Sequence, residues 1–253
     1  MQLVGEDAEK TIITYDDHAN INKMGTFRTY TVKVEGSDIT FKNLTIENNA
    51  APLGQAVALH TEGDRLMFVG CRFLGNQDTI YTGSEGSRLL FTNCYIEGTT
   101  DFIFGPSTAL FEYCELHSKR DSYITAASTP KEVEFGYVFK NCKLTAAPGV
   151  KKVYLGRPWR PYAATVFINC ELGNHIRPEG WHNWKNPENE KTARYAEFGN
   201  TGAGADTSGR VAWAKQLTNK EAMKYTPQNI FKESSNWSVS YTHLRAHETS
   251  QDL

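Results

Sequence analysis

A short hydrophobic pattern returns six times along the middle of the chain, between residues 41 and 172. Each copy opens with phenylalanine, has cysteine or leucine at its fourth position, and ends on isoleucine, leucine or phenylalanine at its sixth. The opening residues are Phe41, Phe68, Phe91, Phe111, Phe139 and Phe167. Their spacing runs from 20 residues (Phe91 to Phe111) to 28 residues (Phe139 to Phe167). A period of this length with variable loops predicts a solenoid whose turns stack in parallel.

The apolar positions inside each copy indicate strands rather than helices. In the fifth copy, Phe139, Cys142 and Leu144 are apolar, and their alternation with polar residues breaks once, at Asn141. Because asparagine tolerates the left-handed backbone region, a one-residue corner there would turn all three apolar side chains inward. Three further copies hold asparagine at this position, Asn43, Asn93 and Asn169. We therefore predict an all-β fold, a parallel β-helix with side chains stacked about 4.8 Å apart from turn to turn.

All five cysteines occupy the fourth position of a copy: Cys71, Cys94, Cys114, Cys142 and Cys170. An inward-facing row explains this regular placement, and the odd count favours buried free thiols over disulfides between turns. Neither the cysteines nor the histidines show metal-ligand spacing, so we expect no metal site. Four histidines are expected at the surface or in turns: His60, His117, His175 and His182.

The repeat runs without a linker, so residues 1–238 are expected to form one domain. A capping-box sequence from Thr218 to Glu221 predicts a short C-terminal helix on the outside or end of the coil. Residues 239–253 abandon the repeat and are expected to form a non-native or disordered tail. Because the chain opens on apolar strand residues, we expect that an N-terminal cap is missing and that the first turn frays or pairs with another copy.

The net charge of −2 and a pI near 6.4 give no global attraction for nucleic acid or for anionic membranes. The sequence contains no apolar run long enough to span a membrane, and its first residues lack the pattern of a signal peptide. Any anionic ligand must therefore be bound by local cations.

Two aspartates stand at equal offsets in consecutive copies. Asp78 lies ten residues after Phe68, and Asp101 lies ten residues after Phe91. Equal offsets predict that the two carboxylates are neighbours on one strand face, roughly one strand spacing apart. Since such carboxylates repel, one must be protonated or compensated by a cation. The alternative is a pair of solvated carboxylates in turns.

The cation available to this pair is Arg157, in a later copy. Its planar guanidinium could bind Asp101 through two hydrogen bonds and keep that carboxylate ionised. Asp78 would then be the group with the raised pKa, because it would face the negative charge of Asp101 beside Tyr81. This asymmetry is typical of acid–base pairs in enzymes.

Four ordered motifs in roughly residues 3–237 resemble the pectin methylesterases of bacterial type, a carbohydrate-esterase family with a right-handed, single-stranded parallel β-helix. The motifs are Gly54-Gln-Ala-Val-Ala-Leu59, Gly75-Asn-Gln-Asp-Thr79, Asp101-Phe-Ile-Phe-Gly105 and Leu155-Gly-Arg-Pro-Trp159. One departure is Thr100, where the family usually has valine before the aspartate. This change is expected to adjust packing without removing a catalytic group.

The resemblance implies a role for each residue of these motifs. Asp101 would be the nucleophile that attacks the methyl ester at C6 of galacturonate, and Asp78 the general acid and then the general base. Arg157 would orient Asp101, while Gln55 and Gln77 would stabilise the oxyanion. The resemblance implies that no metal or organic cofactor is required. Four residues would contact the sugars: Tyr81, Thr100, Phe104 and Trp159. The segment Gly180 to Trp184 is either a loop beside the groove or part of the core.

The implied partner is methyl-esterified homogalacturonan, bound by a monomer that is secreted or periplasmic, with no nucleic acid and no membrane. Two other functions compete with the esterase. A non-catalytic pectin-binding β-helix would share the aromatic residues without needing two stacked aspartates. A β-helical polysaccharide lyase would use a basic residue and usually calcium, but no aspartate cluster suited to calcium accompanies Arg157.

Overall fold

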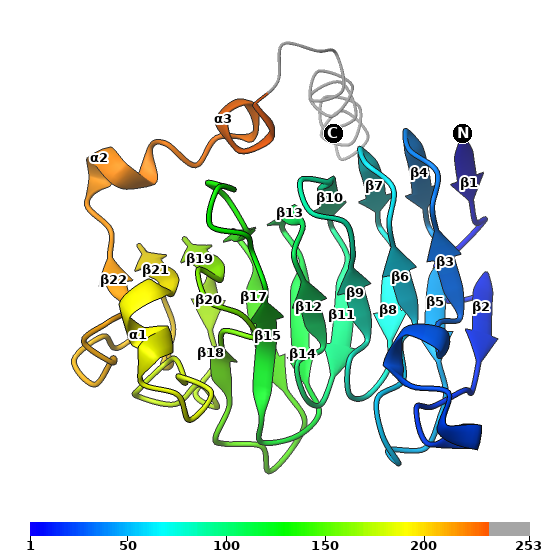
Figure 1. The fold of residues 1–253 in the computed structure, drawn as a ribbon, viewed down its shortest axis with the longest axis horizontal. Helices are drawn as coiled ribbons and strands as arrows, with labels where there is room; N and C mark the ends of the chain where they lie inside the picture. Colours follow the sequence, from blue (N-terminus) through cyan, green and yellow to red (C-terminus); the bar gives the residue numbers. More distant parts are fainter. Residues whose placement is uncertain (233–253) are drawn as a thin grey trace, which may run out of the picture.

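The computed structural model of the protein describes residues 1–232 and consists of three parallel sheets that run along one common axis (Figure 1). In spatial order, the first sheet contains β1 (Gln2–Val4), β4 (Ile39–Lys42), β7 (Leu66–Val69), β10 (Arg88–Thr92), β13 (Thr108–Glu112), β16 (Tyr137–Lys140), β19 (Ala164–Ile168), β21 (Arg194–Phe198) and β22 (Lys215–Gln216). The second sheet contains β2 (Ile12–Tyr15), β5 (Thr45–Asn48), β8 (Arg72–Leu74), β11 (Tyr95–Gly98), β14 (Glu115–Ser118), β17 (Lys143–Ala146) and β20 (Glu171–Leu172). The third sheet contains β18 (Tyr154–Gly156), β15 (Tyr123–Ala127), β12 (Ile103–Gly105), β9 (Ile80–Thr82), β6 (Leu59–Thr61) and β3 (Val32–Val34).

Each of the first six turns of the chain, up to β18, adds one strand to each sheet, so the predicted right-handed parallel β-helix is confirmed. The corner between the first and second sheets lies at the predicted asparagines. Asn93, Asn141 and Asn169 have φ angles of 52°, 53° and 53°, in the left-handed region. Tyr113, which holds the same position in its turn, takes this conformation at φ 55° without being asparagine. The hydrogen-bonded stack therefore imposes the corner, and asparagine makes it less costly.

The interior is filled by the predicted row of phenylalanines. Neighbouring rings from Phe41 to Phe167 are stacked, with centroids 4.4 to 5.1 Å apart. All of these side chains are buried. Because each ring contacts the equivalent ring of the next turn, the register of the strands is fixed by side-chain packing as well as by backbone hydrogen bonds.

The five cysteines are free and buried, as predicted. The Cys94 thiol lies 3.4 Å from the carbonyl oxygen of Phe68 in the preceding turn, and Cys142 lies 3.4 Å from that of Phe111. These contacts satisfy the weak thiol donors inside the coil.

Thiol titration of the native protein is therefore expected to show little reaction, and titration after unfolding without reductant should show five thiols. The physical reason is that a reagent cannot reach a sulfur inside the stacked core. Two or four missing thiols in the unfolded protein would reveal disulfides between turns and would contradict the structure.

The strands β1 and β2 form one edge of the coil. Their apolar residues Leu3, Val4 and Ile12 are exposed to solvent, and each strand pairs with a single neighbour. This agrees with the apolar opening noted in the sequence. Fraying of the first turn, or its pairing with another copy, stays a prediction.

At the other end, an ion pair interrupts the phenylalanine row. Glu197 of β21 is the register partner of Phe167, so a carboxylate takes the place of the next ring. Arg210 donates to both oxygens of Glu197 at 2.8 and 3.2 Å, and the two side chains are 3% and 2% exposed. Trp181 Nε1 donates to the same carboxylate at 3.2 Å. The core therefore ends on a buried, fully hydrogen-bonded charge pair.

Short helices lie outside the strands. They are the 3-10 helices η1 (Ile21–Lys23) and η2 (Thr26–Arg28) and the α-helices α1 (Glu188–Thr192), α2 (Asn219–Ala222) and α3 (Pro227–Phe231). The capping box at Thr218 is present, so the predicted C-terminal helix, α2, is confirmed. No sequence pattern led us to expect α1. No helix within residues 1–232 is long and apolar enough to cross a membrane.

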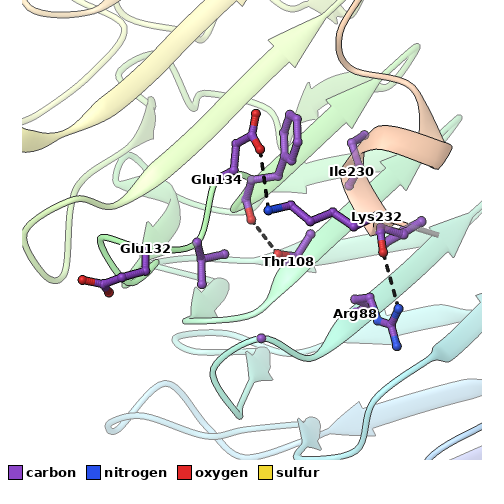
Figure 2. A pocket seen from close by; sticks show the side chains of 10 residues that line it. Arg88, Thr108, Glu132, Glu134, Ile230 and Lys232 are labelled. Atoms are coloured by element: carbon purple, nitrogen blue, oxygen red, sulfur yellow. Dashed lines mark hydrogen bonds and ion pairs between the residues drawn. The ribbon is translucent and has the colours of Figure 1, made fainter. Parts of the chain in front are cut away.

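The segment that carries α3 packs on the outer face of the first sheet (Figure 2). Ile230 and Phe231 are buried there, and Lys232 lies 3.7 Å from Glu134. Nearby, Thr108 Oγ1 donates to the Phe135 carbonyl at 2.6 Å. This face is therefore covered by the chain itself. The expected tail, 239–253, lies outside the described residues.

Candidate active site

Asp78 and Asp101 lie at equivalent places in consecutive turns, directly before β9 and β12. The register of these strands pairs Ile80 with Ile103, which preserves the equal offset predicted from the sequence. The expected location on a strand face is wrong, however. Both residues are in turns with left-handed φ angles of 68° and 49°. The turns are stacked, because the backbone N–H of Asp78 donates to the Thr100 carbonyl at 3.0 Å.

Arg157, which follows β18, binds Asp101 as predicted. Its Nε and Nη2 donate to the two carboxylate oxygens at 3.0 and 2.6 Å. The guanidinium is also held between two aromatic rings, 3.9 Å from the centroid of Tyr123 and 3.7 Å from that of Trp184. Two hydrogen bonds and two ring faces leave this cation little freedom, so it fixes the orientation of the Asp101 carboxylate.

The environment separates the two carboxyl groups electrostatically. Burial raises the pKa of Asp78 well above its usual range, and the negative charge of Asp101 raises it further, while Arg157 opposes both. Burial also raises the pKa of Asp101, and the hydrogen bonds and charge of Arg157 work against that rise. The expected asymmetry is therefore present, with the larger rise in pKa at Asp78. Asp101 remains the member of the pair that is compensated by a cation.

The two aspartates open into a cleft of about 220 Å3 on the outer face of the third sheet. It is lined by Thr26, Phe27, Gln55, Gln77, Asp78, Asp101, Phe104, Ala126, Arg157, Trp159 and Trp184. Gln55 and Gln77 are bridge partners in neighbouring turns. Two amide side chains, a carboxyl group paired with a cation and a second carboxyl group of raised pKa thus lie around one space. A larger cavity of about 430 Å3 lies beside α2, but it contains neither aspartate.

Aromatic residues form the walls of this cleft. Phe104 and Trp159 line it as expected, with ring centroids 5.8 Å apart. Tyr81, also expected to contact the sugars, is not part of the lining, and its ring centroid lies 4.9 Å from that of Phe104. Thr100, expected among the sugar-binding residues, is not part of the lining. The hydroxyl oxygen of Thr100 lies 2.7 Å from that of Ser122 instead.

Two aromatic residues of the cleft did not follow from the sequence. Phe27, in η2, lies 4.9 Å from Tyr81, but its surroundings in the sequence carry no repeat that would place it. The sequence allows the segment that holds Trp181 and Trp184 to lie either beside the groove or in the core, and in the structure its two tryptophans differ. Trp181 is buried in the core, whereas Trp184 lines the cleft.

The expectation for the histidines is wrong for His60, which is a buried residue of strand β6. His175 is also buried, but it lies in a turn, as expected. His60 Nε2 lies 2.7 Å from the Glu62 carboxylate. Within residues 1–232, no group of three or more histidine, cysteine, aspartate or glutamate side chains is placed to hold a metal ion.

Comparison with known proteins places this fold and this site among the carbohydrate esterases. The sequence model of the family described as Pectinesterase matches residues 1–234, and the chain belongs to that family. The chain is 42% identical to Pectinesterase 31 of Arabidopsis thaliana over 231 residues, which cover 87% of this chain and 72% of that protein. Other plant relatives are longer, and the chain covers 42% of two of them.

Solved structures agree with this assignment. The pectin methylesterase from carrot superposes with a TM-score of 0.86 at 33% identity, over 91% of this chain and 76% of that one. A pectin methylesterase in complex with a hexasaccharide superposes with a TM-score of 0.79 at 28% identity, over 92% of this chain and 83% of that one. The relatives named above are plant proteins, so the bacterial type inferred from the motifs finds no support in them.

Proposed function

We propose that the chain hydrolyses the methyl esters at C6 of polygalacturonan, releasing methanol and leaving pectate. The observation that carries the proposal is the Asp101 carboxylate, held by two hydrogen bonds from Arg157 beside a second, buried carboxyl group. Membership of the pectinesterase family and the hexasaccharide bound to a structural neighbour support pectin as the substrate. The aromatic walls at Phe104 and Trp159 provide apolar faces for sugar rings.

The reaction begins with attack by Asp101 on the ester carbonyl. The carbon–oxygen bond that forms gives a tetrahedral intermediate, whose oxyanion accepts hydrogen bonds from the amides of Gln55 and Gln77. The bond to the methoxy group then breaks, and protonated Asp78 gives its proton to the departing methanol. The product of this step is an anhydride between Asp101 and the uronic acid.

Water completes the cycle. The Asp78 carboxylate takes a proton from water as the oxygen attacks the uronyl carbonyl, which restores protonated Asp78. The anhydride bond breaks, Asp101 leaves as a carboxylate beside Arg157, and the uronic acid releases its proton to solvent. No metal or organic cofactor enters these steps. We further propose that the enzyme acts as a monomer outside the cytoplasm, secreted or periplasmic, because polymeric pectin lies outside cells.

The activity is tested by incubating the full chain with highly methyl-esterified homogalacturonan. Methanol and the absorbance of unsaturated uronides are measured in the same sample. The proposal predicts methanol in proportion to enzyme with no rise in absorbance. A rise in absorbance would identify a lyase, and binding to the polymer without either product would identify a non-catalytic pectin-binding protein.

Asp78→Asn is expected to lower turnover by about 100-fold or more, since an amide can neither donate nor retrieve the proton.

The Asp78→Asn variant should also be more stable than wild type at neutral pH. Because the pKa of Asp78 is raised in the folded state, its stabilising proton is present at low pH and is lost as pH rises through that pKa. Asparagine at this buried position cannot ionise, so the variant does not lose this stability as pH rises. Methanol assays and melting curves from pH 4 to 8 check both effects, and wild-type turnover in this variant would refute the role of Asp78.

A further inference from the structure

One wall of the active site is held by a loop rather than by a strand. Trp184 covers one face of the Arg157 guanidinium at 3.7 Å, yet it lies between the isolated bridge at Trp181 and helix α1. The opposite face is covered by Tyr123, which is part of β15 and is therefore fixed by the sheet. The position of Trp184 must depend on contacts made by the loop itself.

The contact nearest to Trp184 is made by His182. Its Nδ1 accepts a hydrogen bond from the backbone N–H of Trp184 at 3.0 Å. This bond closes a turn in which Trp184 and Lys185 have left-handed φ angles of 61° and 58°. Non-glycine residues occupy that region only when their surroundings hold them there. The backbone N–H of His182 in turn donates to the Gly156 carbonyl at 3.1 Å, directly before Arg157.

The neighbours of the His182 ring come from several elements. Tyr123 of β15 and Tyr154 of β18 pack on it, with centroids 5.3 and 5.2 Å away. The positive charges that act on it belong to Arg157, Lys185 of the same loop, and Arg177, which is paired with Glu179. Burial lowers the pKa of His182, and these three cations lower it further. At neutral pH the ring is therefore neutral, with Nδ1 free to accept.

We infer that His182 is a positioning residue for the active site: its neutral ring fixes Trp184 over Arg157 and so completes the clamp on Asp101. Protonation would turn Nδ1 into a donor, and the hydrogen bond from Trp184 would be lost. It would also place a second cation beside Arg157. Both changes release Trp184, and they take effect as pH falls through the lowered pKa of His182, below its ordinary value of about 6.5.

Two substitutions test separately the hydrogen-bond acceptor of His182 and its aromatic ring. His182→Asn keeps an acceptor for the N–H two residues later, as Asn183 does for the N–H of Lys185 at 2.9 Å, but it does not titrate. His182→Phe keeps the ring between the tyrosines and removes the acceptor. His117→Asn is the control, because His117 lies on β14 of the second sheet, where its Nδ1 is 2.8 Å from Thr145 Oγ1.

The test is an NMR titration of the full chain from pH 4 to 8, following the His182 imidazole and the Trp184 indole. We expect both signals to move with one midpoint below about 6.5. The Trp184 transition at this midpoint should vanish in His182→Asn and persist in His117→Asn. The inference would be overturned if the Trp184 indole signal did not shift at the His182 midpoint. It would also be overturned if the same shift persisted in His182→Asn. Neither outcome requires an active enzyme.

The effect on activity rests on the proposed function. At pH 7, His182→Phe should lower kcat/KM for methyl-esterified homogalacturonan by about 2- to 10-fold, the range of one lost hydrogen bond. Most of this loss should appear in KM, because Trp184 lines the cleft. His182→Asn should retain neutral activity and keep more of it at pH 5 than wild type does. If wild type releases no methanol, the proposed function fails, while the NMR titration still decides the role of His182.

Discussion

Asp101→Asn is expected to abolish methanol release from methyl-esterified pectin, with turnover lower by on the order of 10⁴-fold or more, the scale seen when hydrolases lose a nucleophile. The amide has nearly the same shape as the carboxylate but carries no charge, so it cannot attack an ester carbonyl. Arg157 can still contact the amide oxygen and remains packed between Tyr123 and Trp184. The fold should therefore be retained.

The matched control is Asp16→Asn, which removes an exposed carboxylate outside the cleft. This variant should have wild-type activity. Circular dichroism and melting curves of both variants show whether a loss of activity reflects chemistry or unfolding. If folded Asp101→Asn kept turnover within tenfold of wild type, Asp101 could not be the nucleophile.

The second large effect is on stability, at the far end of the core. Arg210→Met should destabilise the protein by about 3 to 5 kcal/mol, because it leaves Glu197 charged and buried without its partner. Arg210 also donates to the carbonyls of Gly204 and Pro178 at 2.7 and 3.0 Å, and these acceptors would lose a donor. For a chain of this size, the expected fall in Tm is roughly 6 to 20 °C.

The double variant Glu197→Leu, Arg210→Met should be more stable than Arg210→Met alone. It removes the unpaired charge and fills the phenylalanine row with an apolar side chain. Lys191→Met provides the control for an exposed pair, since Lys191 and Glu188 are 69% and 72% exposed, and it should leave Tm nearly unchanged. Equal Tm values for Arg210→Met and the double variant would show that the charge of Glu197 is not what destabilises the single variant.

The repeat itself could be predicted from the sequence because its determinants are local. Phe139, Asn141 and Cys142 each repeat a position whose role follows from side-chain type and backbone tolerance. The neighbouring positions of Asp78 and Asp101 could be predicted for the same reason. Each aspartate lies ten residues after the phenylalanine of its own copy, and this spacing does not depend on the length of loops elsewhere. Their left-handed turn conformation did not follow, because aspartate is compatible with both strand and turn.

Features that depend on irregular segments could not be predicted. Phe27 reaches the cleft through the path of η1 and η2, which have no counterpart in other turns. Glu197 was missed because the segment of β21 lacks the pattern of phenylalanine and cysteine, and only the strand register reveals that it continues the Phe167 row. The roles of Trp181 and Trp184 were undecided for a related reason, since both are large and aromatic and only the loop conformation separates them.

The central claim is that methanol leaves before water enters, with the uronic acid held on Asp101. Methyl and ethyl esters of the same oligogalacturonide should then form one common acyl-enzyme. The decisive measurement is the partition of product between free acid and hydroxamate at a fixed hydroxylamine concentration, after subtraction of the uncatalysed reaction. The account predicts the same partition ratio for both esters, because the alcohol has already left. A ratio that changes with the leaving alcohol would mean that water and hydroxylamine attack the ester directly, and would contradict nucleophilic catalysis by Asp101.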